Sequence, residues 1–135
     1  MRIVLDTNVI VSGLINPNGS PAAILNLVVN AKVQLLYDIR ILQEYIEVLH
    51  RKKFGFNPES IEALIDYLQD EGEYISAEPT SMKFKDDDDR AFYEVMITGE
   101  ADYLISGNLS HFPEDKKFKS PREFLTKYEN RNEEK

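Results

Sequence analysis

The chain opens with Met1-Arg-Ile-Val-Leu-Asp6-Thr-Asn-Val-Ile-Val-Ser-Gly-Leu14, the stretch that decides its fold. The apolar run Ile3–Leu5 is typical of a short strand that is buried on both faces. This run ends at Asp6, and a helical pattern begins almost at once at Val9. A strand that passes directly into a helix places its last residue at the carboxyl edge of a parallel sheet, where α/β proteins bind ligands. The sequence therefore predicts a ligand-facing carboxylate at Asp6.

Two roles are open for Asp6. The carboxylate can cap the following helix, which is a common role for aspartate, but Thr7 and Asn8 can cap it as well. An acid at a sheet edge is costly unless water, a cation or a hydrogen-bond donor meets it. We therefore expect Asp6 to bind a metal ion or to take part in catalysis.

Strands and helices alternate along the rest of the chain. The turn-rich residues 16–21 lead into a helix, for which Ser20 is the expected N-cap. Further predicted strands are residues 33–37, 74–75 and 102–106, and further predicted helices are residues 40–53 and those that begin at 58, after 86–89 and at 121. This alternation indicates an α/β fold with helices around a mainly parallel sheet.

Length and composition bound the class of protein. The 135 residues suffice for one domain, expected at residues 1–128, and the charged residues 129–135 are expected to form a disordered tail. There is no cysteine, which excludes disulfides, thiolate metal sites and cysteine nucleophiles. The sequence shows no apolar run of membrane-spanning length and no signal peptide, so we expect a cytoplasmic protein with no membrane partner.

The net charge of −8 argues against a nucleic-acid partner, because phosphate binding usually rests on Lys and Arg. The charge is uneven, however. Acids gather at residues 59–73 and 86–89, whereas residues 51–53 and 116–119 are basic clusters. A metal-dependent enzyme also looks acidic when its cations are left out of the count. Composition alone leaves the partner open.

Other acidic residues are candidates for the same site as Asp6. Glu44 lies at the border of the apolar face of its predicted helix, from which it reaches either the sheet edge or the solvent. Asp88 and Asp89 precede a helix, whose positive end suits aspartate, and both lie on its inward side. The three-residue spacing from Asp89 to Phe92 favours Asp89 slightly, and the choice between the two aspartates stays open.

Small polar residues follow the last predicted strand, at Ser106 and Asn108. They either form a simple turn or lie at the same sheet edge as Asp6. Carboxylates from a strand end, a helix border and a helix start are the oxygen ligands that Mg²⁺ or Mn²⁺ requires, and such an ion promotes phosphodiester cleavage. The two histidines, His50 and His111, are expected at the surface, because nothing in the sequence brings them together.

Five segments resemble the PIN-domain family, and specifically its branch of toxins from type II toxin–antitoxin pairs, the VapC-like ribonucleases. In the family's order, these segments are residues 3–13, 41–45, 86–92, 101–108 and 120–125. The resemblance implies a three-layer α/β/α sandwich around a parallel sheet of four or five strands. It also implies an endoribonuclease that uses Mg²⁺ or Mn²⁺ to hydrolyse RNA.

The resemblance assigns roles by position. The metal-binding acids that it implies are Asp6, Glu44 and Asp89 or its neighbour Asp88. Asn8 matches the polar residue beside the first acid, and Ser106 matches the Thr or Ser near the fourth. At the fourth acid the chain departs from the family and has Asn108. Asparagine offers a carbonyl oxygen but no charge, so a second metal ion should bind more weakly.

The resemblance also implies partners, namely an RNA substrate, a cognate antitoxin protein and a second copy of the chain. The main alternative is a PIN-like scaffold that binds RNA or protein and has a weak or inactive metal site. Asn108 and the net charge favour this alternative, and the retained acids oppose it. A phosphatase with Asp6 as nucleophile is a further alternative, but that chemistry usually has a second Asp where this chain has Asn8.

Overall fold

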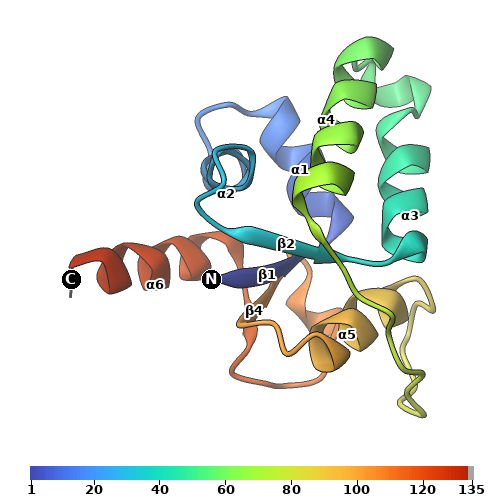
Figure 1. Cartoon of the computed structure of the whole chain (residues 1–135), viewed down its shortest axis with the longest axis vertical. Coiled ribbons are helices and arrows are strands. Elements are labelled where there is room, and N and C mark those ends of the chain that lie inside the picture. Colours follow the sequence, from blue (N-terminus) through green and yellow to red (C-terminus); the bar gives the residue numbers. More distant parts are fainter. Residues whose placement is uncertain (134–135) are drawn as a thin grey trace.

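The computed structural model describes residues 1–133 and shows a sheet with helices on both sides (Figure 1). Within this range the sheet has five strands in the order β3-β2-β1-β4-β5, and every neighbouring pair is parallel. The strands are β1 (Arg2–Leu5), β2 (Gln34–Tyr37), β3 (Glu73–Tyr74), β4 (Tyr103–Ile105) and β5 (Phe118–Lys119). The predicted α/β fold with a parallel sheet is confirmed.

Six α-helices belong to the same described range. They are α1 (Thr7–Ile15), α2 (Ser20–Val29), α3 (Ile39–Leu49), α4 (Pro58–Glu71), α5 (Asp89–Thr98) and α6 (Pro121–Glu133), with short 3-10 helices η1 (Lys52–Phe54) and η2 (Leu109–His111). None of the helices in residues 1–133 is long and apolar enough to cross a membrane.

The order of the strands explains the layers. The chain moves from β1 to β2 to β3 in one direction and then returns across the sheet to β4. Because crossovers between parallel strands are right-handed, the outward steps place α1–α4 on one face and the return step places α5 on the other. Figure 1 shows this separation, and the molecule is the predicted three-layer α/β/α sandwich.

The central strand β1 lies in the core. Ile3, Val4 and Leu5 are each 0% exposed, as expected for a strand whose two faces are both covered by helices. The strand order reverses between β1 and β4, which are neighbours. The backbone N–H of Asp6 donates to the carbonyl of Ile105 at 2.9 Å, so the carboxyl ends of the two strands lie side by side. Such a switch point is where open α/β sheets bind ligands.

Some predicted helix boundaries are wrong. Ser20 is the first residue of α2, and Gly19 occupies the N-cap position. The helix predicted at residues 40–53 ends at Leu49, and η1 follows it as a separate turn. The N-cap of α3 is Asp38, which accepts a 3.0 Å hydrogen bond from the N–H of Ile41 and so begins the helix one residue early.

The expectation of a disordered tail at residues 129–135 is wrong for residues 129–133, which continue α6. The helix is anchored upstream by Phe124, which is fully buried, and by Tyr128, whose ring stacks 6.1 Å from that of Phe124. An anchored helix propagates into charged residues, because adding one residue costs far less than nucleating a turn. Residues 134–135 lie outside the described residues.

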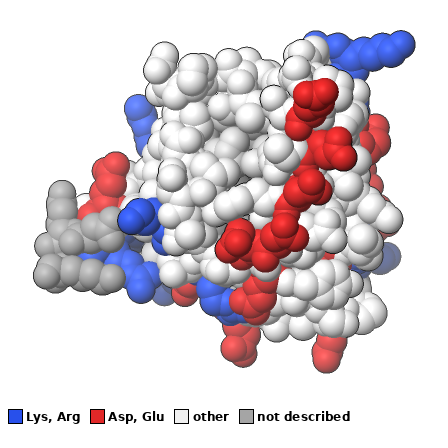
Figure 2. Space-filling model, turned by 45° about the horizontal axis from the view of Figure 1, so that its top comes forward, with Lys and Arg blue, Asp and Glu red and all other residues white. Residues whose placement is uncertain are grey.

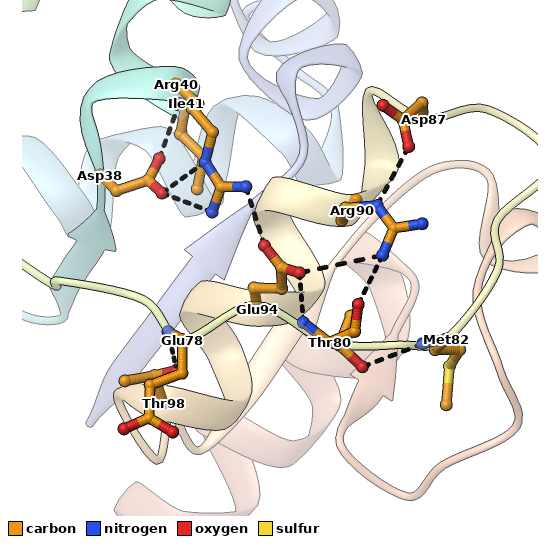
Figure 3. Close-up of polar contacts among 10 residues, drawn as sticks. All are labelled: Asp38, Arg40, Ile41, Glu78, Thr80, Met82, Asp87, Arg90, Glu94 and Thr98. Carbon is orange, nitrogen blue, oxygen red and sulfur yellow. Dashed lines mark hydrogen bonds and ion pairs between the residues drawn. The ribbon is translucent and has the colours of Figure 1, made fainter.

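The segment 75–88, which precedes α5, contains neither helix nor strand and is held by polar contacts (Figure 3). The carboxylate of Glu94 is 3% exposed, accepts a 2.6 Å hydrogen bond from the N–H of Thr80 and pairs with Arg40 at 2.8 Å. Arg90 donates to the carbonyl of Thr80 at 2.9 Å. Glu94 therefore ties this segment to both α5 and α3.

Acidic side chains form rows on the surface. Figure 2 shows such a row of Asp and Glu side chains across one face, with few Lys or Arg side chains beside it. On α4 the exposed acids recur at helical spacing, at Glu59, Glu62, Asp66 and Asp70. Much of the negative charge thus lies on a solvated helix face, so the net charge of −8 says little about the basic cluster at residues 51–53.

Candidate active site

Asp6 lies directly after β1, at the switch point of the sheet. Its carboxylate oxygen Oδ2 accepts a 2.6 Å hydrogen bond from the hydroxyl of Ser106, which follows β4. Asp6 is 8% exposed and Ser106 is fully buried. Although Asp6 occupies the N-cap position of α1, its side chain makes no capping hydrogen bond, and neither Thr7 nor Asn8 is the cap. The carboxylate is therefore free of the capping role.

Glu44 reaches the same place from α3. It is half-buried and accepts a hydrogen bond from the hydroxyl of Thr7, in the first turn of α1. Glu47 lies on the same helix, but its side chain is 61% exposed and pairs with Arg51 at 2.8 Å. The border position of Glu44 on the helix therefore brings it to the sheet edge, whereas Glu47 stays in solvent.

The structure separates the two neighbouring aspartates. Asp89 is the first residue of α5 and is 7% exposed, whereas Asp88 is an exposed residue at the end of the segment 75–88. The expectation that both side chains turn inward is wrong for Asp88, because the helix that would orient it begins only at Asp89. A ring nitrogen of His111, Nδ1, lies 3.1 Å from Oδ2 of Asp89.

Asn8 and Asn108 hold the loop after β4. The side-chain oxygen of Asn8 accepts a 3.2 Å hydrogen bond from the N–H of Gly107. The side-chain nitrogen of Asn108 lies 3.0 Å from Nε2 of His111. A neutral His111 with its proton on Nδ1 donates to Asp89 and accepts from Asn108 at the same time. Asn108 thus orients a histidine, although the resemblance implies a carboxylate at this position.

Sequence reasoning missed His111. The residue is partly exposed, as predicted, yet it lines the same cleft as Asp89. The available signal was its position three residues after Asn108, because this spacing aligns side chains on a 3-10 helix. His50 does not share this place, since it is exposed and its Nδ1 lies 2.7 Å from the carbonyl of Ile46 in its own helix.

These side chains meet at an open cleft of about 460 Å³. It is lined by Asp6, Thr7, Asn8, Val11, Ser12, Glu44, Val48, Arg51, Phe54, Asp86, Asp88, Asp89, Asn108 and His111. The size lies within the range of small-ligand sites. Five of the lining residues are acidic, and they come from three separate parts of the chain, so the fold alone creates this concentration of carboxylates.

Burial raises the pKa values of Asp6, Glu44 and Asp89. Neighbouring negative charges add to the effect of burial. The charges of Asp6, Asp88 and Asp89 raise the pKa of Glu44, and burial together with the charge of Asp6 raises the pKa of Asp89 to about 6. The hydrogen bond from Ser106 opposes the shift at Asp6. Carboxylates that repel one another in this way are stabilised by a cation.

The donor chemistry of the cleft fits Mg²⁺ or Mn²⁺, since it offers carboxylate and amide oxygens. As the side chains stand, no group of three or more acidic or histidine residues within residues 1–133 is arranged to hold a metal ion. The carboxylates of Asp6, Glu44 and Asp89 each contact a protein donor instead. Each of these contacts engages one of the two carboxylate oxygens, so the other oxygen can serve as a ligand once the three side chains draw closer together.

The raised pKa of Asp89 predicts how stability depends on pH in the absence of metal. Because the folded protein holds the proton with a pKa of about 6 and the unfolded chain with an ordinary, lower value, folding takes up a proton between these values. The contribution of Asp89 to the free energy of unfolding should therefore fall as the pH rises through about 4 to 6. Urea unfolding in EDTA at about pH 5 and about pH 7 measures this change.

Asp89→Asn is the matched variant, because it cannot titrate. The loss of stability from about pH 5 to about pH 7 should be larger for the wild type than for Asp89→Asn. Equal losses would show that Asp89 titrates with an ordinary pKa and carries no repulsion from its neighbours.

Comparison with known proteins identifies the family. Residues 2–110 match the family model described as PIN domain, a stretch that contains the strands β1–β4 and all the acids of the cleft. The chain is also 30% identical to the uncharacterized protein MJ1680 of Methanocaldococcus jannaschii, in an alignment that covers 96% of this chain and 92% of that protein. The sandwich and the acidic cleft agree with this match. The chain belongs to the PIN-domain family, whose members are generally nucleases.

Proposed function

We propose that this protein is an endoribonuclease that hydrolyses RNA phosphodiester bonds with the help of Mg²⁺ or Mn²⁺. The observation that carries the proposal is the meeting of Asp6, Glu44 and Asp89 in one cleft at the switch point of the sheet. Burial and mutual repulsion of these carboxylates are costly unless a cation neutralises them. Membership in a family of nucleases supports the same function.

Each residue has a defined part in this proposal. Asp6, Glu44 and Asp89 would hold the ion, and the exposed Asp88 stands at the rim of the cleft as a further ligand. A bound ion lowers the pKa of a water molecule and neutralises the scissile phosphate. The hydroxyl of Ser106 fixes the orientation of the Asp6 carboxylate through the 2.6 Å hydrogen bond.

The loop after β4 positions the rest of the site. Asn8 holds this loop through the N–H of Gly107, and Asn108 orients His111 toward Asp89. Since Asn108 carries no charge and its amide is engaged with His111, one ion should bind more tightly than a second.

Asn108 favours a second candidate function. A PIN-like scaffold that binds RNA or protein without cleaving it needs no full set of metal ligands, and Asn108 removes one carboxylate from the set that the resemblance implies. The three remaining acids, all with raised pKa values, weigh toward the nuclease.

The test is cleavage of labelled single-stranded RNA by the purified protein. Mn²⁺ or Mg²⁺ should support cleavage at internal positions, and EDTA should abolish it, because it removes the ion that would neutralise the scissile phosphate among these carboxylates. Binding of the RNA without cleavage, at any concentration of either metal, would support the scaffold instead.

Two glutamates on α3 give a matched control for this assay. Glu44→Gln should lower cleavage by at least about tenfold, since even the outer hydrogen-bond partners of metal ligands have effects of this size. Glu47→Gln should leave the cleavage rate at saturating RNA near the wild-type value, because Glu47 does not line the cleft and only its exposed pairing with Arg51 is lost. Equal effects of the two variants would contradict the assignment of Glu44.

We further propose that the protein acts in the cytoplasm as the toxin of a toxin–antitoxin pair and forms a dimer with a second copy of itself. The support is the resemblance of five segments to that branch of the family. Ile39 and Ile46 on α3 are 50% and 39% exposed, which leaves apolar surface for a protein partner. Growth arrest on induced expression, relieved by a co-expressed antitoxin, is the corresponding test.

A further inference from the structure

The segment Arg51–Phe56 combines three consecutive cations with two aromatic rings, in the order Arg-Lys-Lys-Phe-Gly-Phe. It consists of η1 and a turn at Gly55, whose φ of 63° lies in the left-handed region that glycine favours. The turn folds Phe56 back onto Phe54, with ring centroids 5.5 Å apart and ring planes 16° from parallel. The ring of Phe54 is therefore held in a defined orientation.

This segment borders the acidic cleft. Arg51 and Phe54 line the cleft together with the carboxylates, and so do the apolar side chains of Val11 and Val48. Phe54 is only partly buried, so its ring is accessible from the cleft. The cleft thus offers an aromatic surface in addition to its acidic groups, and the proposed hydrolysis of a phosphodiester makes no use of that surface.

We propose that Phe54 is the platform on which one unpaired base of a single-stranded nucleic acid stacks, and that Arg51, Lys52 and Lys53 bind its phosphates. This inference rests on the proposed function and states how its substrate is held. Proteins that bind single strands combine a basic track for the backbone with aromatic rings for the bases. The segment provides both within six residues.

The distribution of charge favours a nucleic acid over a protein partner. Lys52 and Lys53 are exposed, and Nζ of Lys53 lies 5.1 Å from the centroid of the Phe54 ring. Arg51 pairs with Glu47, but both side chains are exposed, and such a pair contributes little to stability. Arg51 can therefore exchange its partner for a phosphate. Cations that stand next to an aromatic ring in one short segment match a ligand with both negative charge and flat bases.

Phe54 also restricts the form of the ligand. A base can stack on the ring only when it is unpaired and unstacked, which excludes the interior of a duplex. Because every base has a flat face, stacking tolerates sequence, so this platform should give a weak base preference. Contacts of Lys52 and Lys53 with phosphates should make the affinity fall as salt rises.

Fluorescence anisotropy with a labelled oligonucleotide of about ten nucleotides tests the proposal. Binding is measured in EDTA, so that no cleavage can occur, with single-stranded RNA, single-stranded DNA of the same sequence and duplex RNA. Phe54→Ala should weaken single-strand binding by about 5- to 150-fold, and Phe54→Trp should restore it. Tyr74→Ala is the matched control, because Tyr74 is an exposed aromatic residue, 57% accessible, that does not line the cleft.

The outcomes separate this inference from the proposed function. Unchanged single-strand binding by a folded Phe54→Ala, or equal binding of duplex and single strand, overturns the platform even if the wild type cleaves RNA with Mn²⁺. Binding that depends on Phe54, without cleavage in Mn²⁺, supports the platform and contradicts the nuclease. The DNA arm shows whether the 2′-hydroxyl contributes. A wild type that binds none of the three ligands overturns the inference.

Discussion

Replacement of Asp6 by asparagine is expected to abolish metal-dependent RNA cleavage while the protein remains folded. The rate should fall by about a thousandfold or more, because a bound ion supplies several kcal/mol of stabilisation to the charge that develops in the reaction. Asn has the size of Asp and lacks the charge that attracts the ion. The measurement compares cleavage rates of the two proteins at saturating Mn²⁺, together with their thermal unfolding.

The stability of Asp6→Asn should not fall together with its activity. Asp6 is 8% exposed, and burial is the main cause of its raised pKa, so the charged form is costly in the folded state. The carbonyl oxygen of Asn can still accept the hydrogen bond from Ser106. In EDTA the variant should therefore be as stable as the wild type or more so, as is common where catalysis requires an unfavourable arrangement.

Asp102→Asn is the matched control. Asp102 lies just before β4, at the amino ends of the strands and away from the cleft, where it accepts a 2.8 Å hydrogen bond from the N–H of Arg2. This variant should cleave RNA at the wild-type rate. Retention of cleavage by Asp6→Asn would contradict the assignment of Asp6, and loss of both cleavage and folding would give its carboxylate a structural role instead.

The largest expected effect on stability is that of Glu94→Ala, which should lower the free energy of unfolding by about 2–4 kcal/mol. The buried carboxylate accepts hydrogen bonds from the N–H of Thr80 and from Arg40, whose side chain is 44% exposed (Figure 3). Its removal leaves these donors without their partner and releases the segment 75–88. Urea unfolding measures the loss, and limited proteolysis shows whether this segment becomes the site of cleavage.

Arg90 provides a control within the same network. It also pairs with Asp87 at 3.0 Å, but the side chain of Asp87 is 88% exposed. Asp87→Ala should cost less than about 1 kcal/mol, because exposed ion pairs contribute little. Similar losses for Glu94→Ala and Asp87→Ala would mean that burial does not determine the strength of this network. Glu94→Gln should fall between them, since an amide oxygen can still accept from Thr80.

The first fourteen residues predicted the centre of the fold because their pattern reflects local physics. An apolar run too short for a helix, followed at once by a helix, leaves few possibilities other than a buried parallel strand. The position of Asp6 at the sheet edge follows from the same pattern, and the border position of Glu44 on its helix left the sheet edge within its reach. The alternation of the strands and helices that carry these acids could also be predicted from hydrophobic periodicity alone.

What the sequence could not predict depends on contacts between distant residues. Nothing local distinguishes Asp88 from Asp89, because the residue at which α5 begins decides which of them is buried. His111 becomes part of the cleft only because η2 turns it toward Asp89. In the sequence Glu94 is one more charged residue on a predicted helix. Its burial arises because the segment 75–88 folds over it.

Anomalous scattering of Mn²⁺ in crystals of the protein would locate the metal ion directly. A peak is expected in the cleft within bonding distance of carboxylate oxygens of Asp6, Glu44 and Asp89. Crystals grown without metal should lack the peak. A well-ordered cleft with no peak at saturating Mn²⁺, or a peak bound only by surface acids such as those of α4, would show that Asp6, Glu44 and Asp89 do not form a metal site.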